Sequence, residues 1–182
     1  PLLKNGGFVR FCIHRRENTQ DRKRFTIMIE AIEKLLKSGQ KILLISLFGT
    51  EEAINNFGLR NKLDQMVKNY PETFIYSDVW PYYRDVIAAM RKCDLVATDS
   101  GSMQEEMNIL GIPCVTLRFG SDRAESVFAG GNLLAPPIDS DFIAEIIGTS
   151  LDNKKSMKAG NLYGNNVSKK IVDGVLAKIE KY

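Results

Sequence analysis

The sequence predicts an α/β fold, a Rossmann-like parallel sheet of about six strands with helices on both faces. Two patterns predict this fold. Short apolar runs, such as FVRFCI at residues 8–13, alternate with longer segments in which apolar residues recur at helical spacing. The run KILLISL at residues 41–47 is almost continuously apolar, which is typical of a parallel strand covered on both faces.

The N-terminal half of the chain alternates between expected strands and helices. Asp21 is the expected N-cap of the first long helix. Thr50 is the expected N-cap of the next helical region, which Gly58 interrupts. In order, the expected elements are a strand at 8–13, a helix at 22–37, a strand at 41–47, one or two helices within 51–69, a strand at 73–76 and a helix at 84–92.

The C-terminal half continues the same alternation and ends in a helix with an apolar stripe. That stripe needs a partner surface, and it consists of Val167, Ile171, Val175 and Ile179. In order, the expected elements are a strand at 95–97, a helix at 103–110, a strand at 114–117, a short helix within 122–129, a strand at 133–135, a helix capped by Asp139 or Ser140 that runs to about residue 151, a polar loop at 153–166 and a helix at about 167–181.

The segment at residues 95–111 joins an apolar strand, a small polar turn at 98–102 and a helix. Ser102 is the expected N-cap of that helix, and Glu105 three residues later completes a capping box. Free backbone N–H groups and the positive end of the helix dipole both face such a turn. The turn is therefore a candidate phosphate site, although the same spacing also fits an ordinary capped turn without a ligand.

Several polar groups directly follow expected strands. These groups are His14, the turn at 98–102 and Arg118. Ligands of open parallel sheets bind beyond the carboxyl ends of the strands, so we expect the three groups to lie at one edge. The planar donor fork of an arginine suits a phosphate. Arg15 either joins His14, the only histidine, at the ligand or pairs with Glu17.

Glu106 lies on the first turns of the helix that follows the phosphate turn. A carboxylate at that place can accept hydrogen bonds from two ribose hydroxyls, as in other nucleotide sites. The alternative is that Glu106 complements the positive end of the helix dipole. A nucleotide site is the reading that we favour.

Composition excludes several classes of function. A chain of 182 residues is expected to form one domain, and its net charge of +3 is too small to indicate a nucleic-acid partner. No run approaches the roughly 18 apolar residues that span a bilayer. The three cysteines, Cys12, Cys93 and Cys114, lie in or beside apolar runs. This position predicts reduced core thiols in a cytoplasmic protein, with neither disulfides nor a metal site.

Three motifs carry a resemblance to a known family. DSGSMQEE at residues 99–106 resembles the DSGGxQEE signature of the non-hydrolysing UDP-N-acetylglucosamine 2-epimerases. HRREN at 14–18 is similar to their HRRE(S/N), and RFGSDRAESVFAGGN at 118–132 is similar to their RxxTERPExxxxGxN. The resemblance is to the C-terminal half of a two-domain, GT-B-like enzyme. It implies that residues 1–182 form the UDP-binding Rossmann-like domain and that the N-terminal domain is absent from this chain.

The resemblance also implies a reaction. The family converts UDP-N-acetylglucosamine to UDP-N-acetylmannosamine by eliminating UDP and adding it back with C2 inverted. The family carries its C2 acid and base on the N-terminal domain, so this chain alone is expected to be inactive. No metal or redox cofactor is implied, and the whole enzyme is expected to be a homo-oligomer, a dimer. The implied UDP-binding residues are His14, Arg15, Ser100, Gly101, Ser102, Glu106, Arg118 and Arg123, of which His14 and Arg118 are candidate stabilisers of the leaving group.

The chain departs from the family pattern at several positions. Ser102 stands where the family has a second glycine. Asp122 and Ala124 stand where it has glutamate and proline, and Arg123 between them fits a loop salt bridge as well as a ligand contact. SLFGT at 46–50 replaces a PxHxNP motif that helps form a regulatory nucleotide site in some members, which puts such regulation in doubt.

Two further alternatives concern the base and the reaction. Trp80, Tyr82 and Tyr83 occupy the place where the family cradles uracil, and they either stack on a base or fill the core. The whole protein could instead be a GT-B-type UDP-sugar glycosyltransferase, although the pairing of HRREN with DSGSMQEE argues against it. A non-catalytic UDP-binding module is the third reading, and it describes the isolated chain well.

Overall fold

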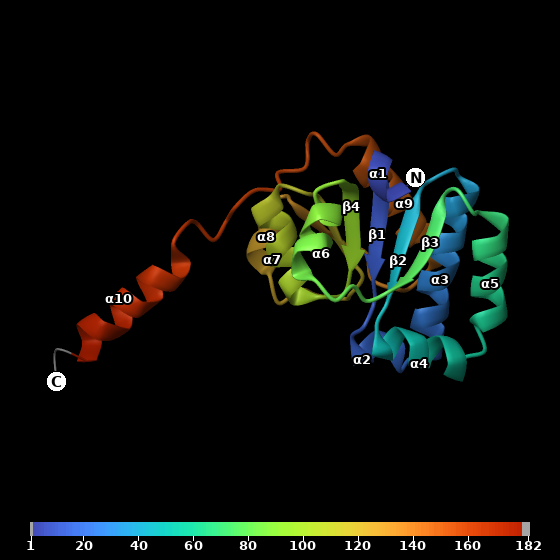
Figure 1. The fold of residues 1–182 in the computed structure, drawn as a ribbon, viewed down its shortest axis with the longest axis horizontal. Coiled ribbons are helices and arrows are strands. Elements are labelled where there is room, and N and C mark those ends of the chain that lie inside the picture. Colours follow the sequence, from blue (N-terminus) through green and yellow to red (C-terminus); the bar gives the residue numbers. More distant parts are fainter. Residues whose placement is uncertain (1, 180–182) are drawn as a thin grey trace.

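In the computed structural model, which describes residues 2–179, six parallel strands form one sheet between two layers of helices (Figure 1). The strand order is β3-β2-β1-β4-β5-β6, and every neighbouring pair is parallel. The predicted six-stranded Rossmann-like sheet is therefore confirmed. The strands are β1 (Phe8–Cys12), β2 (Ile42–Ser46), β3 (Phe74–Asp78), β4 (Cys93–Thr98), β5 (Cys114–Thr116) and β6 (Asn132–Leu134).

The helices of the described residues connect and cover these strands. They are α1 (Leu2–Asn5), α2 (Arg16–Thr19), α3 (Arg22–Lys37), α4 (Phe48–Asn56), α5 (Arg60–Asn69), α6 (Tyr83–Met90), α7 (Gly101–Leu110), α8 (Ala124–Phe128), α9 (Ser140–Asp152) and α10 (Val167–Ile179). The predicted caps of two of them are confirmed. The side chain of Asp21 accepts a hydrogen bond at the start of α3, and that of Asp139 accepts two at the start of α9.

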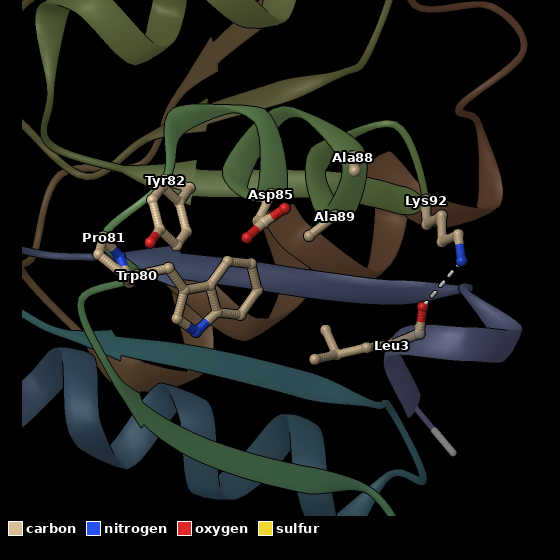
Figure 2. Close-up of a pocket in the computed structure, with 8 residues that line it drawn as sticks. All are labelled: Leu3, Trp80, Pro81, Tyr82, Asp85, Ala88, Ala89 and Lys92. Carbon is tan, nitrogen blue, oxygen red and sulfur yellow. Dashed lines mark hydrogen bonds between the residues drawn. The ribbon is translucent and has the colours of Figure 1, made fainter.

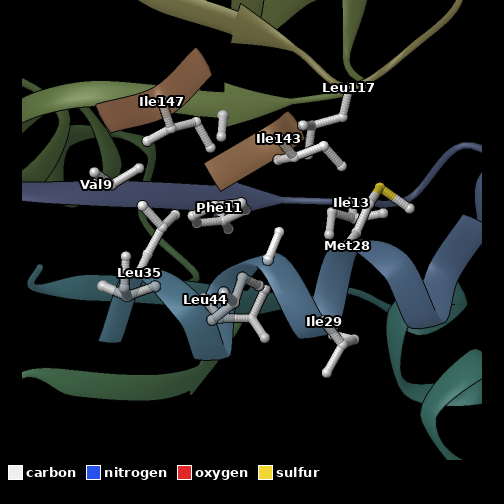
Figure 3. Packing of buried hydrophobic residues seen from close by; sticks show 14 of the residues in the cluster. Val9, Phe11, Ile13, Met28, Ile29, Leu35, Leu44, Leu117, Ile143 and Ile147 are labelled. Atoms are coloured by element: carbon white, nitrogen blue, oxygen red, sulfur yellow. The ribbon is translucent and has the colours of Figure 1, made fainter. Parts of the chain in front are cut away.

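Alternate residues of β1 pack into two separate cores. Val9 and Phe11 face the larger cluster, which Figure 3 shows between β1 and the helices α3 and α9. Phe8 and Cys12 face the smaller cluster, which is formed with α6 and α7. Because successive residues of β1 point to opposite faces of the sheet and both faces are covered, the strand is apolar almost throughout.

Two short elements and one cap differ from the prediction. The helices α1 and α2 are not apparent in the sequence pattern, since each is only one turn long. α4 begins at Phe48, earlier than predicted, so Thr50 lies inside the helix and is not its N-cap. The buried Thr50 hydroxyl instead donates to the carbonyl of Ile13 and accepts from the N–H of Leu47 at 3.3 Å. The hydroxyl thereby ties the start of α4 to the end of β1.

The last helix lies apart from the rest of the domain (Figure 1). No residue of α10 is buried, and the predicted stripe is exposed along its whole described length. The prediction extended this helix to residue 181, but residues 180–182 lie outside the described part of the chain. No helix among the described residues is both long and apolar enough to cross a membrane.

The three cysteines should be inert to thiol reagents in the native chain. All three are free and buried, and burial raises the pKa of Cys12 to about 11 and the pKa values of Cys93 and Cys114 to about 12. Since the thiolate is the reactive form, a disulfide reagent at about pH 8 should label none of them before denaturation and all three in guanidinium. If the reagent labelled one thiol per native chain, that thiol would not be buried as described here.

The exposed stripe of α10 should make this chain self-associate, because apolar patches of this kind mark interaction surfaces. Sedimentation velocity should show a weight-average mass that rises with concentration. Replacing both Ile171 and Val175 by lysine should abolish that rise. Asp173→Lys adds a lysine on the opposite face of the helix and should leave the rise unchanged. A wild-type monomer at every concentration would show that the stripe does not associate.

Candidate functional site

The candidate site lies at the carboxyl ends of β1, β4 and β5, where the strand order reverses and open sheets bind ligands. The structure brings three segments that were predicted from the sequence together at this edge. Gly101, the first residue of α7, is at the meeting point. The position of a Cβ atom added to Gly101 would lie 3.4 Å from Nη2 of Arg15, 3.8 Å from Oδ2 of Asp122 and 3.9 Å from Cζ of Arg123.

A buried carboxylate, that of Asp99, holds the loop after β1 in place. Asp99 has no exposed surface. It accepts hydrogen bonds from the backbone N–H of His14 at 3.0 and 3.2 Å and of Arg15 at 3.0 Å. The amide of Asn18 donates to Asp99 at 3.0 Å and to the carbonyl of Leu117 at 3.0 Å. Asp99 and Asn18 thus join the loops that follow β1, β4 and β5.

His14 lies within this arrangement. Its Nδ1 atom is 3.4 Å from a carboxylate oxygen of Asp99, and its side chain is about one-third exposed. The ring is therefore oriented from one side by the protein and accessible to a ligand from the other. The sequence analysis quoted Asp99 within a motif but gave it no role. The available signal was an acidic residue directly after a buried strand, because a buried carboxylate has to find donors.

The start of α7 differs from the prediction. Ser100, with extended dihedral angles, is the N-cap, and its hydroxyl accepts from the N–H of Met103 at 3.4 Å. The predicted N-cap, Ser102, lies inside the first turn with its side chain exposed, so the predicted capping box is wrong. Its other member, Glu105, is bonded to the guanidinium of Arg123 instead. The N–H groups of Gly101 and Ser102 have no acceptor within the helix, which leaves them for an anion.

The two arginines at this edge are both paired with carboxylates. Arg118 donates from Nε to Glu17 at 2.6 Å and from Nη1 to Oδ2 of Asp122 at 3.0 Å. Arg15 donates from Nη2 to the same Asp122 oxygen at 3.0 Å. The alternative pairing of Arg15 with Glu17 is therefore wrong. Because α2 begins at Arg16, Arg15 and Glu17 do not share a face as they would on a strand.

Arg123 is held by the loop salt bridge that the sequence analysis left as an alternative. Its Nε atom donates to Glu105, and its Nη1 atom donates to the carbonyl of Asp122 at 2.9 Å. The side chain still lies close to Gly101. Arg123 therefore contributes positive charge to the site from a position fixed by α7.

A buried amide network holds the Arg123 loop against α7. Gln104 is completely buried, and its side-chain carbonyl accepts from Asn132 at 3.0 Å and from Ser121. Its amide nitrogen donates to the carbonyl of Ser100 at 3.1 Å. Sequence reasoning missed Gln104 and Asn132, although both are letters of the quoted motifs. A polar residue on the buried face of a helix was the signal.

Glu106 is partly buried one turn beyond the start of α7 and contacts the first residue of α6. Its Oε1 atom accepts from the hydroxyl of Tyr83 at 3.0 Å. Partial burial and this carboxylate raise the pKa of the Tyr83 phenol, so the phenol is the donor at neutral pH. Tyr83 is 62% exposed and does not fill the core. The Tyr83 hydroxyl therefore engages Oε1 of Glu106 and leaves Oε2 out of this hydrogen bond.

A hollow lies beside α6, apart from the start of α7 (Figure 2). Its volume is about 510 Å³, and Trp80 and Tyr82 line one end while Leu3 and Lys92 line the other. Trp80 also packs on the smaller core and donates from its indole to Ser77 at 2.9 Å. Trp80 and Tyr82 are two of the three aromatic residues for which base stacking was left open, whereas none of the predicted phosphate and ribose residues lines this hollow. Among the described residues, no three His, Cys, Asp or Glu side chains are grouped to hold a metal ion.

Comparisons with known proteins show which proteins this chain resembles. The chain is 28% identical over 177 residues to a UDP-N-acetylglucosamine 2-epimerase of Methanococcus maripaludis, covering 96% of this chain and 46% of the relative. It is 32% identical over 179 residues to a UDP-2,3-diacetamido-2,3-dideoxy-D-glucuronate 2-epimerase of Pseudomonas aeruginosa, covering 98% of this chain and 46% of the relative. The chain therefore spans about half the length of the curated relatives that it matches.

Solved structures show the same fold. A UDP-GlcNAc 2-epimerase of Methanocaldococcus jannaschii, solved in complex with UDP-GlcNAc and UDP, superposes with a TM-score of 0.78 at 25% identity. The match covers 94% of this chain and 45% of the archaeal one. The sequence profile of the family described as UDP-N-acetylglucosamine 2-epimerase matches residues 2–176. Since this match includes nearly all of the 182 residues, the chain belongs to the UDP-N-acetylglucosamine 2-epimerase family.

Proposed function

We propose that this chain, residues 1–182, is the UDP-binding C-terminal domain of a two-domain UDP-sugar 2-epimerase. One observation carries the proposal. A free helix start, basic side chains and a carboxylate lie along the first turns of α7, in the order that a nucleoside diphosphate requires. Family membership supports an epimerase over a glycosyltransferase, and the M. jannaschii relative was solved with UDP-GlcNAc and UDP bound.

The diphosphate is assigned to the start of α7. The N–H groups of Gly101 and Ser102 point out of the helix and can donate to phosphate oxygens. Arg15 and Arg118 reach the same place with their guanidinium groups, and the His14 ring is held beside them. The resemblance of the HRREN motif supports the assignment of His14 and Arg15.

The ribose is assigned to Glu106. The glutamate follows Gly101 by five residues, which on a helix corresponds to about 7.5 Å along the axis. A carboxylate at that distance from the phosphates can accept from a ribose hydroxyl. The Tyr83 hydroxyl holds the other carboxylate oxygen and so fixes the orientation of the Glu106 side chain.

The chemistry supplied by this domain is stabilisation of the leaving group. In the proposed reaction the sugar loses its C2 proton and the C1–oxygen bond breaks, so that UDP leaves with the bonding electrons. The negative charge that develops on the diphosphate is stabilised by prepositioned N–H groups and guanidinium groups. Return of UDP to C1 and of a proton to the opposite face of C2 gives the epimer.

Proton transfer at C2 is assigned to the other half of the whole protein. Glu17, Glu105 and Asp122, beside the phosphate site, are engaged by arginines, and the buried Asp99 is occupied by backbone N–H groups and Asn18. The sugar itself is less constrained, because one relative is named for UDP-N-acetylglucosamine and another for a diacetamido-glucuronate. Of these sugars, UDP-N-acetylglucosamine is the substrate that we propose. A cytoplasmic, homodimeric whole enzyme also belongs to the proposal, on the basis of the family resemblance and the reduced thiols.

The isolated chain should bind UDP and should not epimerise a UDP-sugar. It carries the proposed phosphate and ribose groups, whereas the C2 acid and base are assigned to the other half of the whole protein. Calorimetry should detect UDP binding. Proton NMR in deuterated buffer should show no exchange at C2 of UDP-N-acetylglucosamine at an enzymatic rate. Exchange would show that this domain carries the C2 acid and base, and lack of UDP binding would refute the proposed function.

Glu106→Ala should weaken UDP binding by about 1–3 kcal/mol, the range for hydrogen bonds to a charged group. Inorganic pyrophosphate has no ribose, so its affinity should hardly change. Glu145→Ala is the control, because it removes an exposed carboxylate from α9 on the other side of the sheet. Equal losses for UDP and pyrophosphate in Glu106→Ala would show that the glutamate supports α7 and does not contact the ribose.

A further inference from the structure

The carboxylate of Asp122 lies where the positively charged groups of the site meet. Its Oδ2 atom accepts from Nη2 of Arg15 and from Nη1 of Arg118, at 3.0 Å in both cases. The same atom is 3.8 Å from the position that a Cβ atom would take on Gly101, at the start of α7. An anionic group of the protein thus already occupies the meeting point of the two guanidinium groups and the helix start.

Asp122 carries its charge at neutral pH. The hydrogen bond and positive charge of Arg118, followed by those of Arg15, lower the pKa of the Asp122 carboxyl. The side chain is 49% exposed, whereas that of Arg118 is only 11% exposed. The carboxylate is therefore the accessible member of the pair, and the guanidinium of Arg118 is the one that the fold encloses.

The backbone of Asp122 is held in place, because its carbonyl accepts from Nη1 of Arg123 at 2.9 Å, whereas its side chain is half exposed. The residues from 117 to 123 form no helix or strand, and they contain Gly120, where an added Cβ atom would meet nothing within 4 Å. The amide network around Gln104 holds this segment at Ser121. The Asp122 side chain lies beyond that attachment, so it can swing outward without breaking the network.

The remaining ion pairs of the arginines at this edge are also made with carboxylates of the protein. Glu17 accepts from Nε of Arg118, and Glu105 is bonded to Arg123. The guanidinium groups at the start of α7 are therefore neutralised by carboxylates of the protein itself. A phosphate oxygen needs the same donors as a carboxylate oxygen, so an incoming diphosphate has to take the position that Asp122 holds.

We propose that Asp122 is an internal competitor for the diphosphate and lowers the affinity of the site for UDP. The nature of the ligand rests on the proposed function, while the competition rests on the ion pairs of this edge. This role differs from that of a carboxylate that merely holds the arginines in position for the ligand. A supporting carboxylate would strengthen anion binding, whereas a competing one weakens it.

Asp122→Asn tests the sign of this effect, because it removes the charge with almost no change in shape. The variant should bind UDP and inorganic pyrophosphate about fivefold more tightly than the wild type in calorimetry at low salt, as expected for replacing a partly exposed ion pair. Asp122→Ala should show the same direction. Asp173→Asn, which removes one negative charge from α10 far from the site, should bind like the wild type.

Unchanged or weaker pyrophosphate binding by both Asp122 variants would overturn the competition. If weaker binding is restored by Asp122→Glu, Asp122 positions the arginines. If the Asp122 variants bound pyrophosphate more tightly but bound no UDP, the competition would be supported and the assignment of the site to a nucleotide would be refuted. Binding of neither anion by any variant would refute both. Circular dichroism and thermal melting of each variant confirm that the sheet is intact before the affinities are compared.

Discussion

The buried carboxylate of Asp99 is the interaction on which the rest of the site depends. A carboxylate without solvent contact has to be surrounded by donors, since leaving it unpaired would cost several kcal/mol. The donors are two backbone N–H groups from the loop after β1 and the amide of Asn18 from α2. This demand places His14 and Arg15 beside the start of α7. The position of both side chains therefore follows from the burial of one charge between neighbouring strands.

A second set of constraints acts on the far side of α7. Gln104 is bonded through both ends of its amide, to the carbonyl of Ser100 and to Asn132 and Ser121. Buried networks of this kind stabilise a single arrangement when every member is satisfied. Here the network fixes the segment that carries Arg118 and Arg123, so the basic groups on both sides of the helix start are held by buried polar contacts.

The resulting surface combines enclosed and exposed groups. The Asp99 contacts and Arg118 belong to the enclosed part. The side chain of Asp122 is half exposed, and α10 lies apart from the domain with its apolar stripe exposed. The chain spans about half the length of the curated relatives that it matches, and the proposed two-domain protein would need a surface that contacts its other half. The exposed stripe of α10 fits that proposal.

The sequence by itself determined the alternation of strands and helices, the six-stranded parallel sheet and the edge at which the polar motifs meet. It could do so because apolar periodicity and strand ends are local properties of the chain. It also predicted a phosphate role for the turn at 98–102 and a ribose role for Glu106, and both stay predictions. It did not locate α1 or α2, because one-turn helices leave no periodic pattern.

Only the tertiary structure decided how the polar side chains are paired. Ser100 and Ser102 are equally good caps in sequence, and the choice of Ser100 depends on where β4 ends against its neighbours. The pairing of Arg15 with Asp122 and of Arg118 with Glu17 joins residues about a hundred positions apart. The roles of Asp99 and Gln104 arise from burial between loops that are distant in the chain. Local patterns therefore determined the elements, whereas contacts between distant segments determined the site, since a buried polar group takes whichever partner the fold brings to it.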